Sequence, residues 1–205
     1  MSEKPSAYQR FMDSTVATHE RWHDGIGYDL EALAEMTPAE RQHVESRLIQ
    51  NTSDWRDIEA LAALGTESAK AHIRKHLTRG KSELRLAAAD ALNDDNETDV
   101  EREDAIVHAL EEAEPMNGLA RALDLAAEHK SPRIVDALLR CTLSPQREAA
   151  VNAAGLLYFL FGKTQEPFDW SKRLFFLRFG EGSAEQRKAF AEMCKELGVD
   201  PRKYL

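Results

Sequence analysis

The sequence is poor in the residues that bend, break or cross-link a chain. Its 205 residues include 10 glycines, 7 prolines and 2 cysteines. The glycines stand singly or at expected helix ends, so no glycine-rich loop is present that could cradle a phosphate. No serine lies in a Gly-x-Ser-x-Gly turn. The common sequence signatures of nucleotide-binding proteins and of serine hydrolases are therefore missing.

Cysteine usage and hydrophobic runs give further exclusions. Cys141 and Cys194 each lie in a helical pattern with no second cysteine nearby, and we interpret both as reduced thiols in the core. No apolar run approaches the ~20 residues of a membrane span. The first six residues lack the basic start and apolar core of a secretory signal. We therefore expect a cytoplasmic protein that does not bind a membrane.

Strand patterns are missing as well. Val, Ile and Thr never form a run of alternating apolar and polar residues. Ala, Leu, Glu and Arg dominate, and all four are strong helix formers. A hydrophobic content of 42% and a charged content of 31% fit a soluble, folded chain. The predicted fold class is all-α.

A recurring helical unit lies between residues 54 and 161. Four of its segments combine small residues with leucines, and they begin roughly 28 to 35 residues apart, the range of helical-hairpin repeats. They are residues 58–64, 86–92, 120–126 and 150–157. Helices rich in long aliphatic and charged residues separate them. This alternation predicts a helical solenoid, in which stacked hairpins bury one another's faces.

We expect one domain over residues 1–205. Residues 1–53 are predicted to form an N-terminal helical cap, residues 54–162 the repeats and residues 163–205 a C-terminal cap. Aromatic residues are frequent in the last segment and include Trp170. Such a cluster most often closes the open end of a solenoid. The alternative is that an exposed aromatic residue anchors a partner.

The net charge of −9 is concentrated in residues 90–114. This segment holds eleven acids and one base, Arg102, so it carries −10 and the other 180 residues sum to +1. Such a field repels nucleic acid, because binding to phosphate depends on Lys and Arg. It would attract a basic protein and speed its association. The alternative interpretation is a solvated acidic loop and helix start.

One motif could carry catalysis. His19, Glu20 and His23 match the pattern H-E-x-x-H, in which two histidines on one helix face bind zinc and the glutamate acts as general base. No strand precedes this helix, and a glycine soon ends it. We therefore predict no metal, no cofactor and no catalytic residue, with a zinc-dependent hydrolase as the alternative. His72 and His76 are also four residues apart, but we expect them on a solvated basic face.

Polar residues follow the four small-residue helices at equivalent positions. Stacking would place them in a column on one concave face, and the alternative is surface ion pairs between neighbouring helices. Together with the acidic segment and the aromatic tail they define a predicted partner-binding set. Its members are Asp57, Glu59, Asp90, Asp94, Asp95, Glu97, Asp99, Arg121, Asp124 and Trp170.

The Ala- and Leu-rich helix pairs, with an arginine near the helix start at Arg56 and Arg85, resemble HEAT-like repeats across about residues 54–161. Three elements resemble a group of small bacterial HEAT-repeat proteins: Trp-His-Asp-Gly-Ile-Gly-Tyr-Asp at 22–29, Asp-Trp-Arg at 54–56 and Pro-Phe-Asp-Trp at 167–170. Members of that group look like immunity proteins paired with polymorphic or contact-delivered toxins. The resemblance implies a non-enzymatic protein that binds and blocks a cognate toxin. It also makes the zinc pattern look accidental, because the Trp-His-Asp-Gly element covers His23.

Two enzyme groups with HEAT-like repeats resemble the chain less. Alkylpurine DNA glycosylases present a basic groove for DNA, which the acidic segment argues against. Deoxyhypusine hydroxylase relies on repeated His-Glu pairs for iron, and His19-Glu20 is the only such pair here. The leading hypothesis is a protein that covers the active site of a toxin, with its acids opposite a basic groove of the kind nucleases use on phosphate. A general scaffold or adaptor is the second hypothesis.

Overall fold

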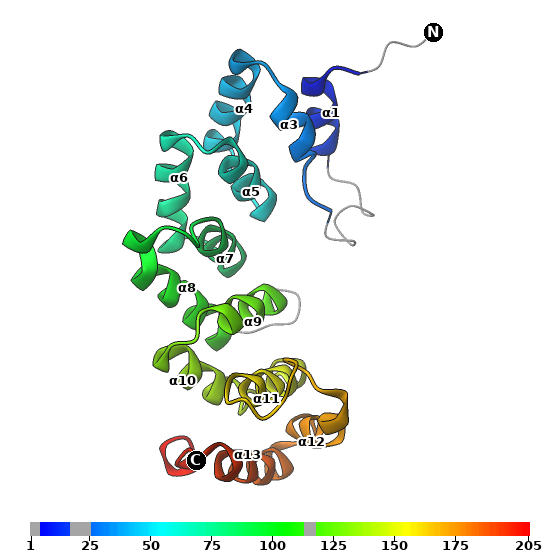
Figure 1. Ribbon diagram of the computed structural model, residues 1–205, viewed down its shortest axis with the longest axis vertical. Helices are drawn as coiled ribbons and strands as arrows, with labels where there is room; N and C mark the ends of the chain where they lie inside the picture. Colours follow the sequence, from blue (N-terminus) through cyan, green and yellow to red (C-terminus); the bar gives the residue numbers. More distant parts are fainter. Residues whose placement is uncertain (1–4, 17–25, 113–117) are drawn as a thin grey trace. The chain divides into compact units, whose positions relative to one another are not determined.

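The computed structural model describes residues 5–16, 26–112 and 118–205 (Figure 1). Every element of regular secondary structure in these ranges is a helix, which confirms the predicted all-α class. None of the helices described is long and apolar enough to cross a membrane.

The chain divides into two compact units, Met1–Thr98 and Asp99–Leu205. The division falls inside the acidic segment, and not at the boundary of either predicted cap. The organisation as one domain over residues 1–205 stays a prediction.

The first unit is built from pairs of helices. They are α1 (Ala7–Ser14), α3 (Leu30–Glu35), α4 (Pro38–Gln50), α5 (Trp55–Leu64), α6 (Glu67–Leu77), α7 (Ser82–Ala91) and the 3₁₀ turn η1 (Asn96–Thr98). α5 lies at the centre and packs against α3, α4, α6 and α7. Within this unit α4 and α6 form one layer, and α5 and α7 form the other (Figure 1).

Local sequence signals set the helix boundaries of the first unit. Thr37 and Glu40 form a capping box at the start of α4, in which each side chain accepts the main-chain N–H of the other residue. Asp54 caps α5 and Thr66 caps α6. Gly65, with φ of 67°, ends α5 in the left-handed conformation that glycine adopts without strain.

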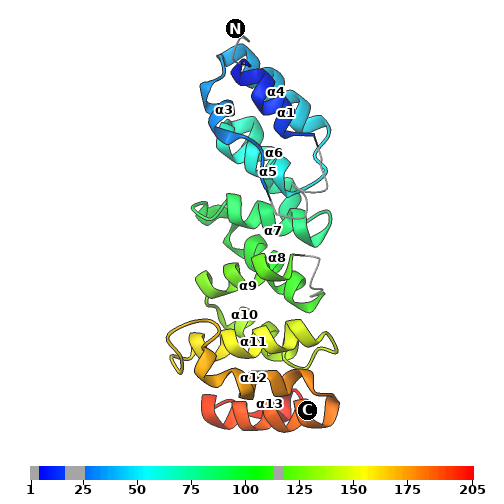
Figure 2. The same cartoon turned by 90° about the vertical axis from the view of Figure 1, so that its right-hand side faces the viewer.

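The second unit continues the pairing of helices. Its elements are α8 (Asp99–Glu111), α9 (Leu119–Glu128), α10 (Pro132–Cys141), α11 (Arg147–Leu160), η2 (Trp170–Lys172), α12 (Arg173–Leu177), η3 (Arg178–Gly180), α13 (Ser183–Leu197) and η4 (Pro201–Lys203). α8 packs against α9 and α10, and α11 packs against α9, α10, α12 and η3. Figure 2 faces the layer that contains α9, α11 and α12.

α11 forms the core of the second unit. Its alanines are fully buried, and side chains this small permit the close approach of α9 and α10. Tyr158 on this helix is buried and donates a hydrogen bond of 2.9 Å to Glu196. Its ring packs edge-on against Phe175 and Phe176. Phe176 and Phe179 are both fully buried, so the C-terminal phenylalanines complete this core.

The two cysteines lie in the interior of the second unit. Cys141 and Cys194 are both buried, and neither forms a disulfide, as expected for core thiols. Burial raises the pKa of the Cys141 thiol to about 12 and, with a smaller effect of Asp200, that of Cys194 to about 11. Both thiols are therefore protonated and unreactive at neutral pH.

Candidate functional site

Asp57, the first residue of the predicted partner-binding set, forms its hydrogen bonds with other residues of the first unit. It is only 5% exposed. One carboxylate oxygen accepts the N–H groups of Ser53 and Asp54 at 2.8 and 3.2 Å, and the other accepts the Tyr28 hydroxyl at 2.9 Å. Burial, then the Asp57 carboxylate, raises the pKa of Tyr28. Asp57 thus joins the chain before α3 to the start of α5 and offers little surface to a partner.

Arg56 beside it is also tied to its neighbours. Its guanidinium is bound by Asp54 at 2.6 Å and lies 5.2 Å from the centre of the Tyr28 ring. Glu59 is half-buried and also makes contacts within the chain. The expected column of exposed polar residues therefore does not begin on α5.

The acidic segment of the first unit is partly neutralised. Asp95 accepts two hydrogen bonds from Arg74 of α6, at 2.6 and 3.0 Å, and this contact lowers the pKa of Asp95. Glu97 lies 4.0 Å from the same guanidinium but is exposed. Asp90 and Asp94 are exposed as well. Of the predicted acids in this unit, Asp90, Asp94 and Glu97 are open to solvent.

The acids of α8 face arginines of α10. Arg133 pairs with Glu103 at 2.9 Å and with Asp104 at 2.5 Å, and Arg140 pairs with Glu111 at 3.0 Å. The partners are 29 or 30 residues apart in the chain. Pairs of this kind on a surface contribute little stability each. They do reduce the negative field that the charge count along the sequence predicts.

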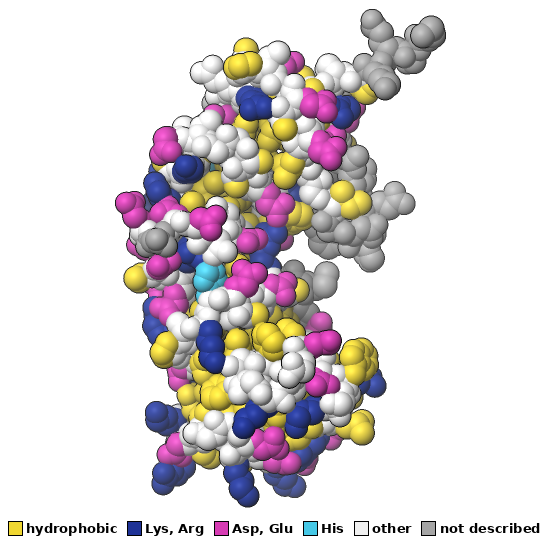
Figure 3. All heavy atoms as spheres, in the orientation of Figure 1, with side chains coloured by type: hydrophobic (Ala, Val, Ile, Leu, Met, Phe, Trp, Pro, Cys, Tyr) yellow, Lys and Arg dark blue, Asp and Glu magenta, His cyan; other side chains and the backbone are white. Residues whose placement is uncertain are grey.

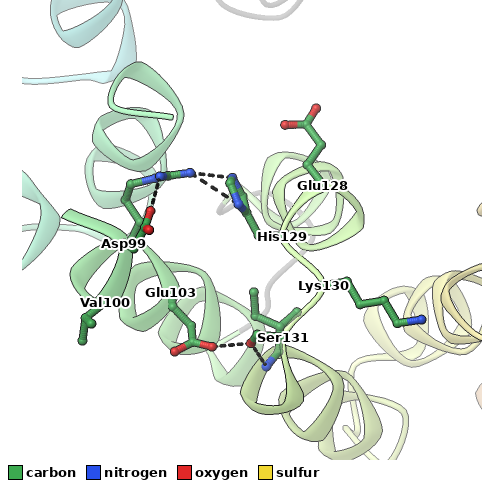
Figure 4. A pocket seen from close by; sticks show the side chains of 9 residues that line it. Asp99, Val100, Glu103, Glu128, His129, Lys130 and Ser131 are labelled. Carbon is green, nitrogen blue, oxygen red and sulfur yellow. Dashed lines mark hydrogen bonds and ion pairs between the residues drawn. The ribbon is translucent and has the colours of Figure 1, made fainter. Parts of the chain in front are cut away.

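A cavity of about 410 Å³ lies at the start of α8 and is lined in part by the predicted residue Asp99 (Figure 4). Arg102, only 3% exposed, donates to Asp99 at 2.9 Å and contacts Nε2 of His129 at 2.7 Å. The Ser131 hydroxyl donates to Glu103. Asp99, Arg102 and Glu103 are thus already used in contacts within the chain.

A second hollow of about 340 Å³ lies between α9 and α11 and is mainly apolar. We refer to it as the α9–α11 groove. Its lining residues are Leu119, Ala120, Leu123, Asp124, Ala127, Glu148, Asn152, Leu156, Pro167 and Phe168. Its two charged residues, Asp124 and Glu148, are both acidic and both exposed. Asp124 belongs to the predicted set, whereas Glu148 was not predicted.

Gly155 allows the connector after α11 to form one wall of the groove. A Cβ atom at this position would lie 2.7 Å from the carbonyl oxygen of Pro167 and 3.0 Å from the ring of Phe168. Contacts this short do not occur in proteins. The connector could therefore not pack against α11 in this way if residue 155 were any amino acid other than glycine. Phe168 in turn packs against Phe176, with ring centres 5.3 Å apart. No local signal in the sequence pairs residue 155 with the connector.

An exposed apolar patch adjoins this wall. Trp170 is 71% exposed and Leu174 is 81% exposed, and we refer to them as the Trp170–Leu174 patch. The Trp170 ring contacts Phe168 of the groove, with ring centres 6.2 Å apart. In Figure 3 hydrophobic side chains gather over α9 and α11, with acidic side chains beside them. The phenylalanines of the C-terminal segment pack inward, whereas Trp170 faces solvent.

The apolar surface continues on the other side of α11. A hollow of about 430 Å³ is lined by Gln146, Arg147, Glu148, Val151, Asn152 and Leu177. Glu148 and Asn152 line both hollows, so they form a polar stripe between two apolar depressions.

Arg121, another predicted residue, is half-buried on α9 and makes contacts within the chain.

His72 and His76 differ from their expected solvated state. Both are partly buried, and their Nε2 atoms are 3.2 Å apart. The Thr52 hydroxyl donates to the carbonyl of Leu48 at 2.7 Å, and its oxygen lies 2.8 Å from Nε2 of His72. Burial lowers the pKa of both imidazoles, with smaller effects of His76 and Lys75 on His72. The pair is therefore neutral at pH 7.

Within the described ranges, no three or more His, Cys, Asp or Glu side chains are grouped so that they could hold a metal ion. The pattern of His19, Glu20 and His23 lies outside the described residues, so the zinc alternative stays a prediction. No family model matches the chain, and no curated protein or solved structure matches it.

Proposed function

We propose that this chain is a HEAT-like α-solenoid that binds a protein partner and is not an enzyme. The paired helices of each unit and the buried alanines of α11 support the repeat assignment. The aromatic residues of the C-terminal segment would then close one end, except for the exposed Trp170.

The Trp170–Leu174 patch is the observation that carries the proposal. Single exposed apolar residues are common on soluble proteins, but contiguous apolar surface marks a binding site. Here the strongly exposed Trp170 adjoins the apolar α9–α11 groove through Phe168, and Leu174, also strongly exposed, follows four residues later. Tryptophan is enriched among the residues that dominate binding energy. A surface of this kind fits association with another protein better than binding of a small molecule.

We propose that the partner is a toxin, which the chain neutralises by covering its active site. The toxin assignment rests on the resemblance to bacterial HEAT-repeat immunity proteins. The exposed acids Asp94 and Glu97 support a partner with a basic surface, such as a nuclease-type effector domain. Neither nucleic acid nor a membrane is proposed as a partner.

Co-expression with the product of the neighbouring open reading frame tests the proposal. We expect that product to be toxic alone, to be neutralised by this chain and to co-purify with it. The double variant Trp170→Ala and Leu174→Ala should weaken binding at least 10-fold, which is about 1.4 kcal/mol. Val100→Ala, at an exposed apolar residue of α8, is the matched control and should bind normally. A non-toxic neighbour, or toxicity that co-expression does not change, would refute the immunity assignment.

The alternatives predict other outcomes of the same measurements. A general scaffold or adaptor would bind a partner that is not toxic. A zinc-dependent hydrolase that uses His19, Glu20 and His23 would contain stoichiometric zinc after purification, which metal analysis of the full chain would detect.

A further inference from the structure

We infer that the α9–α11 groove binds a cationic amphipathic helix of the partner, with apolar side chains between α9 and α11 and a Lys or Arg beside Asp124 and Glu148. The inference rests on the proposed function only in taking the partner to be a protein.

The charge of the groove is the first argument. Asp124 and Glu148 stand on facing helices at the rim of one hollow. Neither carboxylate has a hydrogen bond or ion pair with any residue in the described ranges. The acids of α8 differ, because Glu103, Asp104 and Glu111 each pair with an arginine of α10. Two carboxylates beside apolar surface, without a cation, are complementary to a basic group that a partner supplies.

The shape and chemistry of the walls are the second argument. Leu119 and Leu156 are nearly fully buried and form the floor, and Phe168 forms a wall that Gly155 holds against α11. The volume of about 340 Å³ lies at the lower end of the range for ligand pockets. It is sufficient for large apolar side chains from a partner, but too small to enclose a folded element.

The second depression beside α11 indicates how the partner segment is arranged. Glu148 and Asn152 lie one helical turn apart and separate the α9–α11 groove from the hollow beside Leu177. A helix that crosses this stripe can place apolar residues in both depressions, because residues three and four apart share one face. The same helix can present a basic residue to Glu148.

Peptide selection tests the groove with a defined probe. A library of random 16-residue peptides, displayed on phage, is selected against the full chain. We expect enriched sequences to carry Lys or Arg, with apolar residues three and four positions apart. A synthetic peptide of the enriched sequence is then titrated, by fluorescence anisotropy, into the full chain and its variants.

Charge reversal shows where the selected peptide binds. The double variant Asp124→Lys and Glu148→Lys should weaken the peptide at least 10-fold. The double variant Asp90→Lys and Asp94→Lys makes the same change in net charge at exposed acids of the first unit. It should change the affinity less than about threefold, since neither residue lines the groove. Thermal unfolding of all variants checks that they fold.

Several results would overturn the inference. They are an absence of enriched peptides, enrichment of neutral or acidic peptides, and equal affinity for the Asp124→Lys and Glu148→Lys variant. Concentration-dependent self-association that Trp170→Ala abolishes would assign the surface to a second copy of the chain, and would also overturn it.

The toxicity assay separates this inference from the proposed function. If the wild type and the Asp124→Lys and Glu148→Lys variant neutralise the neighbouring gene product equally well, the groove assignment is wrong and the immunity function stands. If the wild type does not neutralise it, the immunity function is wrong whatever the peptides show.

Discussion

Gly155 of α11 and Pro167 of the following connector approach so closely that a single methyl group would not fit between them. A Cβ atom at residue 155 would lie 2.7 Å from the carbonyl oxygen of Pro167. Phe168, the next residue, lines the α9–α11 groove and contacts Trp170. The missing side chain at residue 155 therefore determines where the wall of the groove and the exposed tryptophan lie.

The variant Gly155→Ala tests this relationship through the sign of its effect. Alanine in place of glycine within a helix should stabilise by about 1 kcal/mol if nothing else changes. Here we expect destabilisation by about 1–3 kcal/mol, because the added methyl group overpacks the contact with the connector. Urea unfolding measures the change in free energy.

Digestion at Lys163 provides a second readout for the same variant. A protease specific for lysine should cut after this exposed connector residue faster in Gly155→Ala, because the connector is displaced from α11. The control is Ala154→Gly, which removes a buried methyl group from the same helix without affecting the connector. A stabilised Gly155→Ala variant with unchanged digestion would show that the close approach is not required.

Asp57 should prove important for stability and not for binding. In Asp57→Ala the N–H groups of Ser53 and Asp54 and the Tyr28 hydroxyl lose their acceptor. We expect a loss of about 3 kcal/mol, the sum of a helix cap and of partly buried groups left unpaired. Asp57→Asn should cost less, because its amide oxygen can still accept the two N–H groups. Urea unfolding measures both variants.

A spectroscopic titration checks the same contact independently. Asp57→Ala should shift the pKa of Tyr28 towards its ordinary value, because a nearby negative charge and hydrogen bond are lost. Asp90→Asn, at an exposed residue, should leave the stability within about 0.5 kcal/mol. An Asp57→Ala variant as stable as the wild type would show that the carboxylate is not structural.

The stability of the first unit should fall as the pH falls below about 6.5. The pKa of His72 and of His76 is lower in the folded chain than the ordinary value of 6.5. Protons therefore bind more readily to the unfolded chain, so the contribution is complete above pH 6.5 and is lost as the pH falls towards the folded pKa values. A proton on both Nε2 atoms, 3.2 Å apart, would also place two N–H groups against each other.

The double variant His72→Gln and His76→Gln isolates this effect from the other five histidines. Free energies of unfolding at pH 7.5, 6.5 and 5.5 should depend less on pH in the variant than in the wild type. Parallel pH profiles for the two proteins would contradict the assignment.

Those structural features that depend on neighbouring residues could be predicted from the sequence. The start of α4 is such a feature, because the capping box of Thr37 and Glu40 acts within four residues. The all-α class followed from helix formers and missing strand patterns. The role of Asp57 was not predicted, because periodicity placed it off the apolar face while Tyr28, 29 residues away, supplies its partner.

The candidate site was predicted only in part, because contacts between residues far apart in the chain leave no local signal in the sequence. Trp170 and Asp124 were identified as an aromatic residue in an irregular segment and as an acid on a small-residue helix. Glu148 was missed, because nothing local distinguishes it from any solvated acid at a helix start. The neutralisation of α8 by Arg133 was missed as well, since its partners lie on another helix 29 or 30 residues away.

Charge reversal at two places in the acidic segment should distinguish acids that speed association with a partner from acids that stabilise the fold. Asp90→Lys and Asp94→Lys change exposed acids of the first unit, so the fold should be unaffected. Association with a basic partner should slow by about 2- to 3-fold and depend less on salt, while dissociation is unchanged.

Glu103→Lys and Asp104→Lys make the same change in charge where Arg133 of α10 is the partner. Two new cations would face this guanidinium, so we expect a loss of stability of about 1 kcal/mol. Surface plasmon resonance at two salt concentrations measures the association rates, and urea unfolding measures the stabilities. If the first pair left the association rate unchanged, the acids of the first unit would be a solvated loop. If the Glu103→Lys and Asp104→Lys variant were as stable as the wild type, the ion pairs of these two acids with Arg133 would not stabilise the second unit.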